Sequence, residues 1–236
     1  MSRYFVDLHC HTNASFDSLS DPRKVVTAAA TRGLTHLAIT DHDRIDGALR
    51  ARDAAPAELT VIVGEEVHTV DGDLIALFLE RPVDPHRPAR ETIEAVRAQG
   101  GLVGIPHPFD RFRGSMLTDP GLEGMAQLVD WVEAHNARVV GGSGNERAQQ
   151  FARDMGLPGI AVSDAHSVLE VGVAYTALNV DPSTPQGLLA ALTNVELVPG
   201  RASYIVRTLT PLAKLINRAR GNRRVPPPSA TSEGTA

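Results

Sequence analysis

The beginning of the chain contains the stretch that decides the fold, Tyr4-Phe5-Val6-Asp7-Leu8-His9-Cys10-His11-Thr12. Its first part, residues 4–8, is a short apolar run that predicts a β-strand. His9 and His11 follow directly, and alternate residues of an extended strand point the same way. We therefore expect a strand that ends in two imidazoles able to meet one metal ion. Cys10 points to the opposite side and is expected in the core.

The rest of the chain repeats this pattern of a short apolar run followed by a helical segment. Further strands are predicted at 36–40, 60–67, 74–79, 102–105, 131–134, 159–162 and 173–178, and helices at 21–32, 45–53, 88–99, 122–128, 145–155 and 185–192. Asp21-Pro22 is typical of a helix start, with aspartate as N-cap and proline at the first helical position. The alternation predicts an α/β fold with parallel strand pairs.

The choice between an open sheet and a closed barrel depends on the glycine motifs and the number of units. No G-x-G-x-x-G follows the first strand and no G-x-x-x-x-G-K-[ST] is present, which disfavours a nucleotide-binding open sheet. About seven strand–helix units favour a barrel, in which the chemistry lies at the carboxyl ends of the strands.

The composition is that of an ordinary globular protein. The chain has 236 residues, of which 42% are hydrophobic and 22% charged, and this length suits one sizeable domain. Its single cysteine excludes an internal disulfide. No apolar run is long enough to span a membrane, and early charges disfavour a signal peptide. We expect a cytoplasmic protein.

Charge is distributed unevenly along the chain. Residues 1–200 contain 16 basic and 27 acidic residues, whereas residues from 201 onward contain seven basic residues and one acid. An acidic body is consistent with cation binding and disfavours a broad nucleic-acid-binding face. We expect a catalytic domain at 1–204, a basic amphipathic helix at 205–221 and a disordered tail at 222–236. The helix either packs on the barrel or docks on a partner.

Candidate metal ligands recur where the predicted strands end. Five of the nine histidines lie at such positions, namely His9, His11, His42, His107 and His166. The carboxylates found there are Asp17, Asp41, Asp43, Glu65, Glu66 and Asp164. Each short motif alone is weak, but their repetition is informative. Burying so many polar groups without partners would cost roughly 1–3 kcal/mol each. Imidazole and carboxylate ligands without thiolate favour two or three ions of zinc, manganese or iron.

Together these motifs resemble the PHP superfamily of polymerases and histidinol phosphatases. The resemblance covers about residues 4–200 and rests on His9-Cys10-His11-Thr12, Asp17, Thr40-Asp41-His42-Asp43, Gly64-Glu65-Glu66, Pro106-His107-Pro108 and Ser163-Asp164-Ala165-His166-Ser167. It implies a distorted (β/α)7 barrel with a three-metal cluster that hydrolyses phosphate esters.

The resemblance also implies a role for each matching residue. His9, His11, Glu66 and Asp164 would hold one ion, Asp17, His42 and His166 a second, and Glu66 with His107 a third. Asp164 would also bridge two ions, and a metal-activated hydroxide would attack phosphorus. We expect His42 or His166 to protonate the leaving alcohol.

The sequence departs from the family pattern after the glutamate motif. Asp73 stands where many members have a histidine ligand of the third ion, so it either ligates through oxygen or leaves that ion weak or absent. His68 and His135 are weaker candidates, with Glu133 and Asn136 as supports of the ligands. Arg111 and Arg113 follow His107 and are candidates for binding the substrate phosphate.

Several functions remain open at this point. The substrate is a small phosphomonoester, a nucleotide or a short oligonucleotide. A histidinol-phosphatase-like enzyme and a non-catalytic metal-binding regulatory domain are alternatives. An amidohydrolase is disfavoured, because the only lysines, Lys24 and Lys214, lie outside the predicted strand ends.

Overall fold

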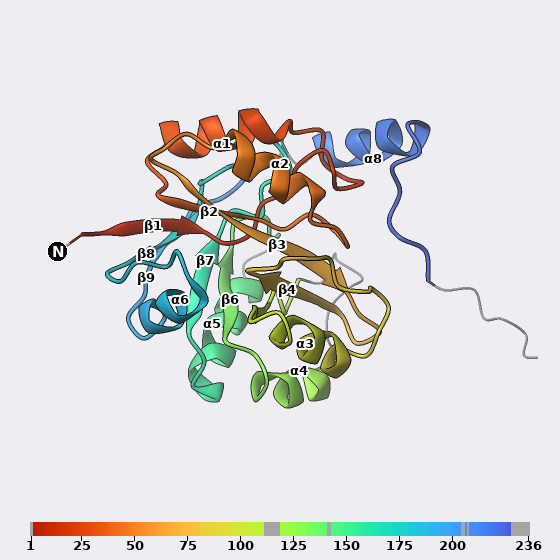
Figure 1. The fold of residues 1–236 in the computed structure, drawn as a ribbon. Helices are drawn as coiled ribbons and strands as arrows, with labels where there is room; N and C mark the ends of the chain where they lie inside the picture. Colours follow the sequence, from red (N-terminus) through yellow and green to blue (C-terminus); the bar gives the residue numbers. More distant parts are fainter. Residues whose placement is uncertain (1, 111–118, 141–142, 204–205, 207, 228–236) are drawn as a thin grey trace, which may run out of the picture.

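The fold is described from a computed structural model that covers residues 2–110, 119–140, 143–203, 206 and 208–227. One sheet contains the strands β1 (Tyr4–Asp7), β2 (His36–Ile39), β3 (Thr60–His68), β4 (Asp73–Leu77), β5 (Leu102–Ile105), β6 (Trp131–Asn136), β7 (Gly159–Val162), β8 (Tyr175–Leu178) and β9 (Glu196–Val198). The helices are α1 (Pro22–Thr31), α2 (Asp46–Ala54), α3 (Ala89–Arg97), α4 (Asp119–Ala126), α5 (Ser143–Met155), α6 (Pro185–Ala191) and α8 (Leu209–Ala219). Figure 1 shows α1 and α2 on one side of the strands and α3 and α4 on the opposite side.

The sheet curls into a nearly closed barrel, which confirms the predicted α/β barrel. Its strand order is β7-β6-β5-β4-β3-β2-β1-β8-β9. A buried hydroxyl spans the seam between β7 and β8, where Thr176 Oγ1 accepts from Ala161 N at 2.9 Å and donates to Ala161 O at 3.0 Å. The backbone of His11 also donates to Ala165 O at 2.8 Å, so the segments that follow β1 and β7 are joined.

Two of the strands do not follow the parallel pairing that the alternation predicts. β4 is antiparallel to both β3 and β5, and β8 is antiparallel to β1 and β9. The physical reason for the first exception is the short turn between β3 and β4, where Thr69 N donates to Gly72 O and Gly72 has φ +136°. A connection this short can only join antiparallel strands. The short strand β9 was not predicted.

Local signals placed the helix ends well. Asp21 caps α1 by accepting a hydrogen bond from Arg23 N, and Pro22 is its first residue, as predicted. None of the helices described here is long and apolar enough to cross a membrane.

Two apolar layers enclose the strands. The outer layer packs the helices on the sheet and includes Cys10, as expected. The inner layer fills the barrel with Val6, Leu8, Ala38, Ile62, Ile75, Leu77, Leu102, Trp131, Ile160, Val162 and Leu178. The indole of Trp131 is fully buried and lies directly over Gly104, where a Cβ atom would be 2.1 Å from Trp131 Cε2. Glycine is therefore required at position 104 by the close approach of the indole.

We expect Gly104→Ala to destabilise the protein by about 1–3 kcal/mol or more, because the added methyl group forces the buried indole to move. Gly124→Ala is the matched control, since a Cβ there meets nothing within 4 Å and the residue lies on an exposed helical surface. The control should be neutral or stabilising by about 0.4–1 kcal/mol. Urea unfolding of both variants measures the difference, and equal midpoints would contradict the packing argument.

Candidate metal centre

The barrel brings its candidate ligands together at one end. β1, β2, β3, β5, β6 and β7 run in the same direction, because β4 is antiparallel to both of its neighbours. Pairing continues past the strand ends through isolated bridges between Cys10 and Ala165 and between His42 and Glu66. The residues that follow these strands are therefore held against one another at the carboxyl end of the barrel.

The first cluster, called the inner group, consists of His9, His11 and Asp164. Their ligand atoms lie within 4.8 Å of one another, and all three residues are buried. The two Nε2 atoms are 3.0 Å apart, and Asp164 Oδ1 is 3.6 Å from His9 Nε2 and 3.5 Å from His11 Nε2. The predicted convergence of both imidazoles therefore occurs in the structure.

The second cluster, called the outer group, consists of His11, Asp17, His42 and His166. Their ligand atoms also lie within 4.8 Å of one another. Asp17 Oδ2 is 3.3 Å from Nε2 of both His42 and His166. His11 belongs to both groups, so the two candidate sites are adjacent.

Glu66 lies between the two groups. Its Oε2 is 3.3 Å from His9 Nε2, His11 Nε2 and His42 Nδ1, and its Oε1 is 3.2 Å from His107 Nε2. Burial alone would raise the pKa of this carboxyl, but His42 and His9 around it lower its pKa well below its usual range. Glu66 is therefore an ionised carboxylate surrounded by imidazoles.

This arrangement fits divalent metal ions. Ligands that bind zinc at about 2.0–2.2 Å lie roughly 3–3.5 Å from one another around the ion, which is the spacing of the nitrogen and oxygen atoms here. The Nδ1 atoms of His11 and His107 are buried without a hydrogen-bond partner among the described residues. The donor set of imidazole and carboxylate suits zinc, manganese or iron.

His42 and His166 of the outer group differ in charge in the metal-free protein. Burial alone would lower the pKa of His42, but the carboxylates of Glu66 and Asp17 raise it to about 9. Burial and then the positive charge of Arg138 lower the pKa of His166 to about 3, despite the neighbouring Asp17. At neutral pH, His42 is therefore protonated and His166 is neutral.

The backbone is strained at three positions of this end of the barrel. His107, Asp164 and Asp43 have φ values of +26°, +52° and +56°, although none is glycine. Such conformations cost roughly 1–3 kcal/mol and persist where the surroundings impose them, often at functional sites. Asp164 belongs to the inner group and His107 contacts Glu66, whereas Asp43 accepts from His68 N and pairs with Arg224.

Glu133 and Asn136 of β6 support the ligands, in the role expected for them. Glu133 Oε1 is 2.6 Å from His9 Nδ1, and its Oε2 accepts from His107 N at 2.8 Å. Asn136 Nδ2 donates to Glu133 Oε2 at 2.8 Å and to Asp164 Oδ2 at 2.9 Å. Partners of this kind fix the orientation and tautomer of ligating side chains.

Asp73 lies in neither group. Its Oδ1 is 2.6 Å from His68 Nδ1 and accepts from Arg224 Nη2 at 3.1 Å. Arg224 also places its Nε 3.6 Å from Asp43 Oδ2, so one guanidinium serves two buried carboxylates. Arg224 lies in the segment predicted as a disordered tail, and no local signal distinguishes it from the other arginines near it.

The remaining candidates have other partners or lie outside the described residues. His135 Nε2 is 2.8 Å from Gly200 O, and its Nδ1 is 3.3 Å from Asn145 Nδ2. His36 Nε2 is 2.9 Å from Ser183 Oγ, which agrees with a role unrelated to the cluster. Arg111 and Arg113 fall in the segment 111–118, which the structure does not describe.

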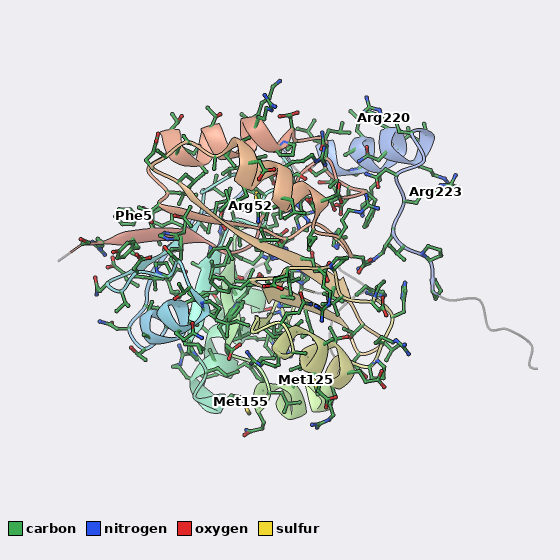
Figure 2. The ribbon with its side chains drawn as sticks, in the orientation of Figure 1. Phe5, Arg52, Met125, Met155, Arg220 and Arg223 are labelled. Atoms are coloured by element: carbon green, nitrogen blue, oxygen red, sulfur yellow. The ribbon has the colours of Figure 1, made fainter. Side chains whose placement is uncertain are left out.

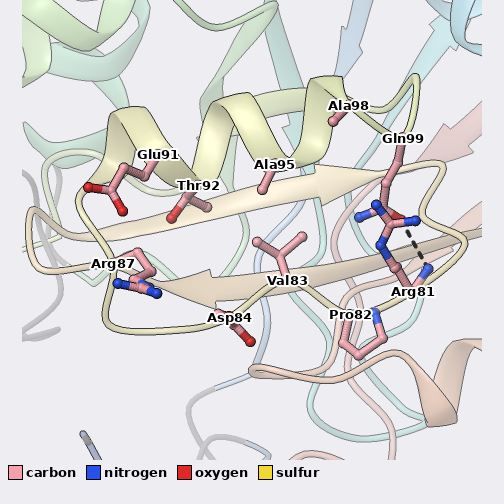
Figure 3. Close-up of a pocket in the computed structure, with 10 residues that line it drawn as sticks. All are labelled: Arg81, Pro82, Val83, Asp84, Arg87, Glu91, Thr92, Ala95, Ala98 and Gln99. Carbon is pink, nitrogen blue, oxygen red and sulfur yellow. Dashed lines mark hydrogen bonds between the residues drawn. The ribbon is translucent and has the colours of Figure 1, made fainter.

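The surface formed by the described residues includes the following two cavities. One, of about 270 Å³, is lined by His166 together with Leu19, Ser20, Asp21, Lys24, Ser167, Val168, Leu209, Leu212 and Ala213. The other, of about 470 Å³, lies between α3 and residues 81–87 (Figure 3). None of the ligands of the inner and outer groups lines this second cavity, so the first is the one adjacent to the candidate chemistry.

Comparison with known proteins gives matches to family models and to related sequences. The family model described as PHP domain matches residues 7–109, and the model described as PHP-associated matches residues 142–196. Protein MJ1587 of Methanocaldococcus jannaschii is 32% identical over 133 residues, which are 50% of this chain and 78% of that protein. The error-prone DNA polymerase of Cutibacterium acnes is 33% identical over 120 residues, 45% of this chain but only 11% of the polymerase.

A solved structure shares the fold. It is a two-domain protein of Bacteroides vulgatus containing a predicted PHP-like metal-dependent phosphoesterase, with a TM-score of 0.70 and 19% identity. The similarity covers 84% of this chain and 65% of that one. The two family models, the matched archaeal relative and the ligand clusters at the carboxyl end of the barrel agree, and this chain belongs to the PHP family.

Proposed function

We propose that this chain is a metal-dependent phosphoesterase that hydrolyses a small phosphomonoester, a nucleotide or a short oligonucleotide. The observation that carries the proposal is the pair of adjacent ligand clusters that share His11 and enclose Glu66. Two ions about 3.5–4 Å apart, when bound, would activate a water and stabilise the attacking and leaving oxygens of a displacement at phosphorus.

The protein's own residues supply the geometry. In our proposal His9, His11, Glu66 and Asp164 hold one ion, and Asp17, His42 and His166 hold another. Glu66 and His107 are the available ligands for a third.

We propose His42 and His166 as ligands rather than as proton donors to the leaving alcohol, because a metal-bound imidazole carries no proton at its ligating nitrogen. The cavity beside His166 supports a small leaving group, because its volume of about 270 Å³ lies near the lower end for small-molecule sites. Its wall combines leucines with Lys24, so both apolar and anionic parts of a substrate find partners there.

The central test combines metal analysis with a phosphatase screen in the presence of manganese, zinc or iron. The panel contains p-nitrophenyl phosphate, nucleotides, nucleoside bisphosphates and short oligonucleotides. We expect His9→Ala and Asp164→Ala to lower kcat/KM by about 100-fold or more, since even the loss of a ligand's partner costs 10- to 100-fold. Circular dichroism establishes that the variants are folded.

Arg81→Ala is the matched control for this screen. Arg81 lines the cavity between α3 and residues 81–87, away from the inner and outer groups, so its replacement should leave kcat/KM unchanged. Wild-type protein that binds the metals but hydrolyses nothing in the panel would instead support a non-catalytic metal-binding domain. Full activity in the His9 and Asp164 variants would overturn the assignment of the centre.

Metal affinity should rise with pH between about 6.5 and 9. The pKa of His42 is raised to about 9 in the metal-free protein, and an ion requires its neutral imidazole. Binding at pH 7 therefore releases the proton of His42, whereas binding above pH 9 does not. Zinc titration by calorimetry, in two buffers with different ionisation enthalpies, measures the released protons. Proton release that does not change with pH would contradict this charge assignment.

Asp73→Ala decides whether the third ion depends on this carboxylate. Its Oδ1 already faces His68 and Arg224, so we expect the number of bound ions to stay the same and stability to fall by about 1–3 kcal/mol. Metal content after dialysis and thermal unfolding provide the two readouts. Loss of one ion per chain would show that Asp73 is a ligand.

A further inference from the structure

The C-terminal segment, residues 209–225, is here called the strap. It begins with α8 and docks on the barrel beside the loop that joins β1 to α1. We propose that the strap positions the outer group, so that the ion held by Asp17, His42 and His166 is bound tightly only when the strap is docked. This inference rests on the proposed function, because it concerns how the same metal centre is held.

Asn217 of α8 holds the loop that carries Asp17. Its side chain is buried, and Nδ2 lies 3.2 Å from Ser15 O, 3.1 Å from Phe16 O and 2.9 Å from Ser18 O. These carbonyl groups flank Asp17 on both sides. Since the loop has no sheet partner of its own at these carbonyls, the amide of Asn217 provides the hydrogen bonds that a strand would otherwise supply.

Asn222 extends the same interaction along the loop. Its Nδ2 lies 3.3 Å from Asn13 O, 3.0 Å from Ala14 O and 3.3 Å from Ser15 O. Two amides of the strap thus converge on one short stretch of backbone. The position of Asp17 is set at least in part by residues 200 positions later in the chain.

Arg224 reaches the neighbourhood of His42. Its guanidinium pairs with Asp43, the residue next to His42, and with Asp73. The ring of Phe16 fills the space between these elements, because its centroid is 4.9 Å from that of His42 and 5.8 Å from the guanidinium carbon of Arg224. The strap therefore supports His42, the second ligand of the outer group, through the ion pair of Arg224 with Asp43 and the packing of Phe16.

His166, the third ligand of the outer group, is connected to the strap through the buried ion pair of Arg138 and Glu170. Thr210 Oγ1 accepts from Arg138 Nη2 at 2.8 Å, and Arg138 Nη1 is 2.8 Å from Glu170 Oε1. Glu170 Oε2 in turn accepts from the backbone of His166 at 3.1 Å. Every ligand that is particular to the outer group thus has a chain of contacts to residues 209–225.

The inner group is held differently. His9 and Asp164 are oriented by Glu133 and Asn136, both of which belong to β6. These supports lie in the barrel and involve no residue of the strap. Disturbing the strap should therefore weaken one ion and spare the other, a split that general destabilisation would not produce.

The test measures metal affinity in full-length variants, with zinc alone as the probe. In Asn217→Ala, we expect one of two bound ions to be held about 10- to 100-fold more weakly, because residues that orient ligands have effects of this size. The affinity of the other ion should be unchanged. Arg218→Ala is the matched control, since Arg218 is the exposed neighbour of Asn217 on α8.

A second pair of variants keeps the test decisive if Asn217→Ala fails to fold. Arg224→Ala should weaken the same ion, whereas Arg223→Ala should not, because Arg223 is exposed and points into solvent, as does Arg220 (Figure 2). Activity of both affected variants should recover at high metal concentration. Unchanged affinities, or equal weakening of both ions, would overturn the role of the strap. Wild-type protein that binds no ion would overturn the proposed function itself.

Discussion

The structure depends on electrostatic compensation around Glu66. This carboxylate is buried where four imidazoles approach it, and an isolated charge in such a place would carry a large desolvation penalty. The surrounding histidines offset that penalty and keep the carboxylate ionised. A divalent cation would take over this compensating charge, because the imidazoles release their protons when they bind a metal ion. Charge balance and metal binding are therefore two aspects of one arrangement.

The barrel makes this arrangement possible by supplying a rigid ring of strand ends. Six parallel strand ends meet at one rim, and bridges beyond the regular strands hold the ligand segments side by side. The apolar interior of the barrel, which includes Trp131, packs beneath this rim. Strained φ values at His107 and Asp164 are tolerated because the hydrogen bonds of Glu133 and Asn136 hold these residues in place.

The outer group depends on contacts with the strap, which lies outside the barrel strands. Asp17 lies on a loop whose carbonyls have hydrogen-bond partners in the strap, and the strap also brings Arg224 to the carboxylates beside His42. Arg224 and His68 both contact Asp73, which the sequence analysis named as a candidate ligand of the third ion. The guanidinium of Arg224 thus pairs with the carboxylate of Asp73, which would otherwise be available to a metal ion.

Local sequence was enough to predict the barrel, most of its helix starts and the gathering of candidate ligands at its strand ends. Periodicity, capping residues and His-x-His spacing are properties of neighbouring residues, and neighbours determine secondary structure and side-chain direction. Tertiary structure alone decided the closure of the seam by Thr176 and the contacts of Asn217, Asn222 and Arg224. These features join residues from 15 to more than 200 positions apart, and no short-range pattern encodes which distant donor meets which buried acceptor.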